Sequence, residues 1–179
     1  MKRAEKHTPP TVPQGRLGKG MIYVAWLIGL GLLTWVFSSY LDAQRNPNRR
    51  VHSFIEDGLP VVVLERNRYG HYNATGQING HAVEFMLDTG ATTVSVPAAV
   101  ARRLRLQRGP AVSVSTANGM VTAYLTRLQS VRLGGIELRD VTATINPSAE
   151  SEEVLLGMSF LKHLEFAQRD NTLVLKQLP

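Results

Sequence analysis

The chain of 179 residues contains no cysteine. This absence excludes a disulfide framework, a thiolate metal site and a thiol nucleophile. It leaves the cellular compartment open, because a cysteine-free domain is compatible with either side of a membrane. The length allows one folded domain and an appendage.

Residues 51–179 also lack a net charge, because their twelve basic side chains balance twelve acidic ones. The formal charge of +6 belongs to the first 50 residues, which carry eight basic and two acidic side chains. The high isoelectric point is therefore a property of the N-terminal segment. We expect no nucleic-acid binding by the domain.

Two common catalytic patterns are missing as well. His71, His81 and His163 have no metal-ligand spacing, and no H-x-x-x-H sequence occurs. Ser95, Ser113 and Ser115 lie outside any G-x-S-x-G turn, the setting of a hydrolase serine nucleophile. We expect neither a metal ion nor another cofactor.

Charged residues are absent from Met21–Tyr40. Twenty helical residues span about 30 Å, the thickness of a bilayer core, and Tyr23, Trp26, Trp35 and Tyr40 lie near the two ends, as interfacial aromatic residues do. The alternatives are a cleaved signal peptide, whose apolar region is usually shorter, and a buried soluble helix. The pattern favours a single transmembrane signal-anchor at residues 21–40, after a disordered cytoplasmic tail at residues 1–20.

The charges beside this segment predict its orientation. Five basic residues precede it and three follow it. The positive-inside rule then places the N-terminus in the cytoplasm. We expect a single-pass protein of the inner (cytoplasmic) membrane with a periplasmic or otherwise extracytoplasmic domain.

After the apolar segment, the pattern is typical of β-structure. Residues 41–58 are expected to form a linker, and residues 59–179 the domain. Asn79-Gly80, Ala117-Asn118-Gly119 and Gly134-Gly135 each separate two apolar stretches and predict hairpins. Many short strands predict an all-β fold, a small closed barrel-like lobe with one or two short helices. The expected strands include Val61–Leu64, His71–Ile78, His81–Leu87, Ala111–Thr116, Met120–Leu125, Leu128–Leu133, Ile136–Leu138, Val141–Ile145 and Thr172–Leu175, and the helices Pro97–Leu104 and Met158–Leu164.

The tetrapeptide Asp88-Thr89-Gly90-Ala91 follows the apolar run 82–87 and occurs once. A carboxylate at the end of an apolar strand suits acid–base chemistry, and the glycine that follows lets another segment approach closely. The alternative is that Asp88 is an ordinary turn or N-cap residue. The small, β-prone continuation at residues 91–97 favours the catalytic interpretation.

A second motif, Val154-Leu155-Leu156-Gly157-Met158-Ser159-Phe160-Leu161, leads from two apolar residues and a glycine into a short helix. Together the two motifs resemble those of the retropepsin-like aspartic proteases, the single-lobe group that includes retroviral and retrotransposon proteases. In that family D-[TS]-G-A starts the active-site loop, and a hydrophobic-hydrophobic-Gly motif downstream braces it. The sequence is most similar to a bacterial, membrane-anchored branch with T-A-N-G and L-L-G-M-S-F-L segments. The resemblance covers about residues 60–176.

The resemblance implies a role for each residue of the first motif. Asp88 would be the catalytic aspartate, paired with Asp88 of the partner subunit in a homodimer. Thr89 would hydrogen-bond across the dimer, and Gly90 would permit the close approach and contact the substrate backbone. Ala91 would complete the active-site loop.

The resemblance also assigns supporting segments. Leu155, Leu156 and Gly157 would brace the loop without acting chemically. The second hairpin would be a flap that closes over a bound peptide, with its tip at Thr116, Ala117, Asn118, Gly119 and Met120; the alternative is an ordinary hairpin turn.

The implied activity is that of a membrane-anchored aspartic endopeptidase on peptide or protein substrates. A water molecule activated between two Asp88 carboxylates would attack the peptide bond, without metal or cofactor. The alternatives are a catalytically inactive module of the same fold that binds peptides or acts as a scaffold, and a monomeric β-domain. One departure from the retroviral enzymes is that their chain ends build a dimer sheet, whereas this N-terminus leads into the apolar segment.

Overall fold

The structure is a computed structural model and describes residues 15–116 and 119–178. By its internal contacts the chain divides into two compact units, Met1–Leu41 and Asp42–Pro179. The second unit carries all the strands of the described residues. It is the unit in which both sequence motifs lie.

The described part of the first unit is helical. Helix α1 (Gly15–Arg45) contains the predicted segment 21–40 and continues four residues past the end of this unit. Between Gly20 and Arg45 it contains an 18-residue window with a mean hydropathy of 1.9, and none of that window is buried. The helix is therefore long and apolar enough to cross a membrane, a property that N-terminal signal sequences share. Helical geometry continues to Arg45, beyond the apolar run.

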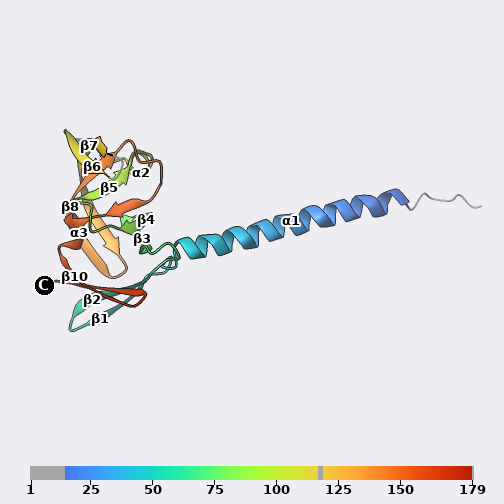
Figure 1. Ribbon diagram of the computed structural model, residues 1–179, viewed down its shortest axis with the longest axis horizontal. Helices are drawn as coiled ribbons and strands as arrows, with labels where there is room; N and C mark the ends of the chain where they lie inside the picture. The colour runs from blue at the N-terminus through green and yellow to red at the C-terminus, as the bar shows by residue number, and fades with distance from the viewer. Residues whose placement is uncertain (1–14, 117–118, 179) are drawn as a thin grey trace, which may run out of the picture. The chain divides into compact units, whose positions relative to one another are not determined.

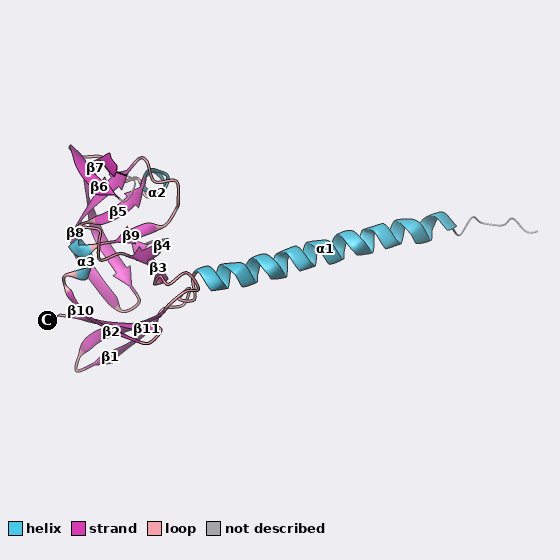
Figure 2. Ribbon diagram, in the orientation of Figure 1, coloured by secondary structure: helices cyan, strands magenta, loops and turns pink. Residues whose placement is uncertain are grey.

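The second unit contains a closed β-barrel, as predicted from the sequence (Figure 2). Pairing runs through six strands in the order β3, β4, β9, β5, β8 and β7, and β7 pairs again with β3 through Gln77–Arg132 and Ile78–Val131. Strand β6 extends the sheet beyond β7. The bounds are β3 Asn73–Ile78, β4 His81–Leu87, β5 Val94–Pro97, β6 Ala111–Thr116, β7 Gly119–Leu133, β8 Ile136–Asn146 and β9 Val154–Leu156.

The barrel encloses an apolar core. Phe85 on β4, Leu128 and Leu133 on β7, Ile136 on β8 and Phe160 are each fully buried. Burying a large apolar side chain of this kind stabilises the fold by about 1.5–3 kcal/mol. Two short helices complete the lobe, α2 (Ala98–Arg103) and α3 (Met158–Leu161). Both were predicted from the sequence, but the second was expected to reach Leu164, which instead begins strand β10.

The turns explain why the strands pair as they do. Asn79 and Gly80 have φ values of 50° and 79°, the left-handed pair that a two-residue hairpin requires. Their predicted hairpin is β3–β4. The other two predicted hairpins share a strand, because β7 continues without interruption through Thr126 and Arg127. It pairs with β6 over its first part and with β8 over the rest.

A second, four-stranded sheet joins the beginning and the end of this unit in the order β1, β2, β11, β10. In Figure 1 the teal strands β1 and β2 belong to the same sheet as the red strands of the C-terminus, and β11 lies between β2 and β10. All pairings in this sheet are antiparallel. The bounds are β1 His52–Glu56, β2 Leu59–Glu65, β10 Leu164–Arg169 and β11 Thr172–Gln177.

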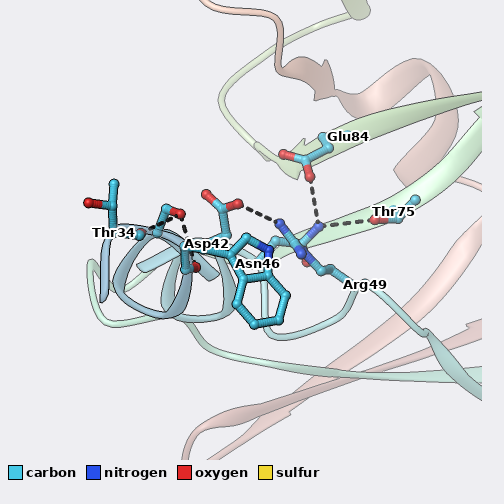
Figure 3. A network of polar contacts seen from close by, with 8 residues as sticks. Thr34, Asp42, Asn46, Arg49, Thr75 and Glu84 are labelled. Atoms are coloured by element: carbon cyan, nitrogen blue, oxygen red, sulfur yellow. Dashed lines mark hydrogen bonds and ion pairs between the residues drawn. The ribbon is translucent and has the colours of Figure 1, made fainter. Parts of the chain in front are cut away.

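Residues 41–58, expected to form a linker, are instead largely part of the folded unit. Asn46 and Asn48 are buried, with 2% and 4% of their surface exposed. The Asn46 side chain donates to Thr75 Oγ1 at 3.1 Å and to Glu84 Oε1 at 3.5 Å (Figure 3). The expected start near residue 59 is therefore too late, because two asparagines and strand β1 tie this segment to the sheets.

Candidate active site

Asp88 lies where β4 ends. Strand β4 pairs in parallel with β9, with Leu87 opposite Leu156, and the Asp88 amide donates to the Leu156 carbonyl at 3.3 Å. Phe85, two residues before Leu87, is fully buried. The strand is thereby anchored in the core, and the half-buried Asp88 carboxylate lies at its end, at the surface of the barrel.

The loop after Asp88 folds back onto the carboxylate. The Gly90 amide donates to Asp88 Oδ1 at 2.8 Å, and the Ala91 amide donates to the Asp88 carbonyl at 3.3 Å. A backbone amide that donates to a carboxylate oxygen fixes the orientation of that carboxylate. Thr89 and Gly90 are exposed at the tip of this turn, where a second molecule can reach them.

Backbone amides of the second motif hold the loop that follows Asp88. The Met158 amide donates to the Ala91 carbonyl at 2.8 Å, and the Ser159 amide donates to the Thr92 carbonyl at 3.0 Å. Both donors belong to the first turn of α3, whose amides have no partner within the helix. These two amides therefore find their acceptors in the loop that follows Asp88, and the hydrogen bonds fix that loop to the helix.

Gly157 makes this contact possible. A Cβ atom at position 157 would lie 2.6 Å from the Ala91 carbonyl oxygen and would overlap the Thr93 carbonyl. Its φ of −89° is accessible to any residue, so the requirement is one of space. Leu156 beside it is fully buried, while Leu155 is half-buried between β4 and β5.

Two further side-chain contacts support the loop, and the sequence-based prediction assigned no role to the residues that make them. Ser159 Oγ accepts a hydrogen bond from the Val94 amide at 2.9 Å, and Thr93 Oγ1 lies 3.1 Å from Thr144 Oγ1. Ser159 follows the Gly157 motif by two residues, which is the one signal that the sequence offers. The threonine pair is separated by 51 residues and has no local signature.

The expected flap corresponds to the β6–β7 hairpin. Thr116 Oγ1 donates to the Gly119 carbonyl at 2.8 Å, which closes the turn, and Met120 is 67% exposed. Ala117 and Asn118 lie outside the described residues. Among the residues that are described, this hairpin makes no hydrogen bond to the Asp88 loop.

Comparisons with known proteins agree with this geometry. Residues 74–163 match the family described as "gag-polyprotein putative aspartyl protease". The chain belongs to the retropepsin-like aspartic proteases. The matched range begins on β3 and ends just after α3, so it contains Asp88, the hairpin and Gly157. The resemblance predicted from the two motifs is thereby confirmed.

Two relatives extend the comparison. The chain is 32% identical over 168 residues to an uncharacterised protein in the cobV 5′ region of Sinorhizobium sp., covering 86% of this chain and 71% of that one. The crystal structure of a retropepsin-like aspartic protease from Rickettsia conorii matches with a TM-score of 0.57 and 25% identity. That match covers 72% of this chain and 96% of the other. The retropepsin-like lobe thus accounts for most of the second unit.

Proposed function

We propose that the protein is a membrane-anchored aspartic endopeptidase that works as a homodimer. The observation that carries the proposal is the Asp88 turn: a half-buried carboxylate, oriented by the Gly90 amide and braced by α3. A single lobe supplies one such carboxylate, so the second is Asp88 of the partner subunit. Membership of the retropepsin-like family supports the same assignment.

The chemistry follows from the proximity of two carboxyl groups. Two carboxylates that share a site do not both ionise readily, so the pair holds one proton between them. The ionised member takes a proton from a water molecule, and the protonated member donates its proton to the carbonyl oxygen of the scissile peptide. The water oxygen then attacks the carbonyl carbon. The carboxyl group that took the proton from water passes it to the amide nitrogen, the C–N bond breaks, and the carboxylic acid and the amine are released. No covalent enzyme intermediate forms, and the step requires no metal or cofactor.

The substrate is a peptide in extended conformation. A peptide that lies beside the β6–β7 hairpin as an added strand forms main-chain hydrogen bonds with it. Thr116, Gly119 and Met120 belong to this flap, together with residues 117 and 118. The exposed Met120 offers an adaptable apolar contact for substrate side chains.

The anchor is helix α1, with its span at residues 21–40. Its length and hydropathy support this role, and the excess of basic residues before the span supports a cytoplasmic N-terminus. The lobe then works in the periplasm or an equivalent extracytoplasmic space. Confinement to a membrane plane raises the effective concentration of chains and so favours pairing.

The test is cleavage of a peptide library by the full chain and by Asp88→Asn and Asp88→Ala, over acidic to neutral pH. We expect both substitutions to abolish cleavage while circular dichroism and the unfolding midpoint stay close to those of the wild type. Activity should rise faster than linearly with protein concentration. Equal cleavage by wild type and Asp88→Asn contradicts the proposal, whereas peptide binding without cleavage by either protein supports a non-catalytic peptide-binding or scaffolding module.

A further inference from the structure

Exposed arginines gather at the start of the second unit, soon after the apolar segment 21–40. Three of them follow that segment in the sequence, and two belong to loop 66–71, which lies between β2 and β3. The five are Arg45, Arg49, Arg50, Arg66 and Arg68. Residues 51–179 as a whole carry no net charge, so this concentration of one sign is a local feature.

The buried Asn67 attaches loop 66–71 to the chain at Arg45. Its Nδ2 donates to the Arg45 carbonyl at 3.0 Å, and its Oδ1 accepts from the Tyr69 and His71 amides, both at 2.9 Å. The Asn67 amide donates to the His71 carbonyl at 2.8 Å and closes the loop. The loop is therefore a fixed structure that stays next to Arg45.

The guanidinium groups of loop 66–71 are held in place and still have free donors. Arg66 Nε donates to the Gly70 carbonyl at 3.1 Å. Arg68 Nη1 donates to Gln44 Oε1 at 2.6 Å, and the guanidinium carbon of Arg68 lies 4.9 Å from the centre of the exposed Tyr69 ring. Because a guanidinium has five N–H donors, most of the donors on both arginines stay available to a ligand.

Three of the five arginines have no carboxylate partner. Arg49 pairs with Asp42 at 3.2 Å (Figure 3), and Arg45 lines a hollow that also contains three carboxylates. Within residues 15–116 and 119–178, no ion pair involves Arg50, Arg66 or Arg68. A guanidinium donates two parallel hydrogen bonds to a phosphate. The unpaired cluster therefore fits an anion that carries phosphate groups.

The connection to the apolar segment limits how far this cluster lies from a bilayer. Arg45 is five residues after Tyr40, the last residue of the uncharged run, and both belong to α1, where five residues rise about 7.5 Å. The headgroup region of a bilayer is about 5–8 Å thick on each side. If the segment spans the membrane, Arg45 and the loop attached to it lie at the headgroups.

We propose that loop 66–71, together with Arg50, docks on the phosphates of anionic phospholipid headgroups beside the anchor. The proposal rests on the membrane anchor of the proposed function. Arg66 and Arg68 bind the phosphates, and Tyr69 lies at the interface, where tyrosine places an apolar ring and a polar hydroxyl. The lobe is then attached to the membrane at two points. The docking holds for either orientation of the span, since both leaflets expose phosphate groups.

Quenching by labelled lipids tests the docking. The chain has no cysteine, so His71→Cys, at an exposed position of the loop, adds a single site for a fluorophore. The full chain is reconstituted in nanodiscs whose lipids carry a nitroxide on the headgroup. We expect stronger quenching in discs that contain phosphatidylglycerol than in discs of phosphatidylcholine, and loss of the difference at high salt. The matched control Met120→Cys, exposed on the β6–β7 hairpin, should show no difference.

Removal of the two charges tests the role of the arginines. In the His71→Cys chain, Arg66→Gln with Arg68→Gln should lower the ratio of docked to free loop by about 25-fold, as expected for two arginines beside an anionic surface. Arg66→Lys with Arg68→Lys disturbs the same internal hydrogen bonds but keeps the charges, so it should retain most of the docking. Arg102→Gln with Arg139→Gln, at two exposed arginines elsewhere, should have no effect.

The outcomes separate the docking from the anchor and from the peptidase. If alkaline carbonate does not extract the full chain from membranes but the loop label is quenched equally in both kinds of disc, the docking is wrong and the anchor stands. Extraction by carbonate contradicts the anchor and the docking with it. Wild-type quenching in the double glutamine variant also overturns the docking. Cleavage assays on Asp88→Asn test the peptidase independently of each of these results.

Discussion

The α-carbon of Gly157 packs against the carbonyl oxygen of Ala91, where an added methyl group would lie 2.6 Å from that oxygen. This contact lets the first turn of α3 donate two backbone hydrogen bonds to the loop behind Asp88. The position of the carboxylate is thus fixed by backbone packing between segments far apart in the sequence.

We expect Gly157→Ala to destabilise the lobe by about 1–3 kcal/mol, because the loop must move away to relieve the overlap. Peptide cleavage should fall more than stability alone explains, since the displaced loop carries Asp88. Urea unfolding and cleavage assays on the same preparation measure both effects. The matched control is Gly29→Ala, whose methyl group meets nothing within 4 Å. Wild-type stability and activity of Gly157→Ala would show that the contact is not required.

The buried Asn48 ties the start of the folded unit to β2 and β3. Its Nδ2 donates to the carbonyls of Glu65 and Asn73 at 2.9 and 2.7 Å, and its Oδ1 accepts from the Glu65 amide at 2.7 Å. Asn48→Ala leaves these buried groups without partners, and we expect it to cost about 2–4 kcal/mol in chemical denaturation. Asn48→Asp keeps the shape and the acceptor but loses both donors, so it should also destabilise. A neutral effect of both changes would contradict the role of this side chain.

The same contacts predict where the folded unit begins. A fragment that starts at Asp42 retains Asn46, Asn48 and β1, whereas one that starts at Leu59 loses all three. We expect the longer fragment to give dispersed amide resonances and a cooperative thermal transition. The shorter one should be much less stable or fail to fold. Equal stability of the two fragments would show that residues 41–58 are a linker and not part of the folded unit.

Lys176, on β11, makes the stability of the four-stranded sheet vary with pH in the alkaline range. Hydrogen bonds to Glu56 and Asp57, at 3.1 and 3.2 Å, raise the pKa of its ammonium group above the ordinary value of 10.5. The folded chain then binds this proton more tightly than the unfolded chain. The resulting stabilisation is complete below pH 10.5 and is lost as the pH rises through the raised pKa.

Substitution of Lys176 by methionine removes that contribution. We expect Lys176→Met to be less stable than wild type at neutral pH, and the difference to shrink as the pH rises above 10.5. Urea midpoints across this range measure the change, with Lys162→Met as an exposed lysine control. A difference that does not vary with pH would mean that the ion pairs do not stabilise the fold.

The sequence was sufficient to predict the β-barrel and the family, because its hairpin turns and its two motifs have local signatures. Asn79-Gly80 specifies a hairpin, an apolar strand precedes Asp88, and the Gly157 motif leads into a helix. Family membership leads us to expect that the Asp88 motif and the Gly157 motif contact each other in the fold.

What the sequence did not predict depends on contacts between distant segments. Asn46 and Asn48 flank a proline and have the composition of a turn, yet their amides are buried because β2, β3 and β4 lie around them. Strand β10 carries exposed charged residues, and its apolar and polar residues alternate only weakly, as is common in an edge strand. Its pairing depends on β11, which returns between β2 and β10.

The most direct test of the central claim, that two Asp88 carboxylates from two subunits form one site, is a mixing experiment. Wild type and Asp88→Asn chains are co-expressed in equal amounts, and cleavage is measured per total chain at a concentration where the protein is dimeric. If mixed dimers are inactive, random pairing leaves about a quarter of the all-wild-type activity. A remaining activity of about one half would mean that each lobe acts alone, and it would contradict the shared site.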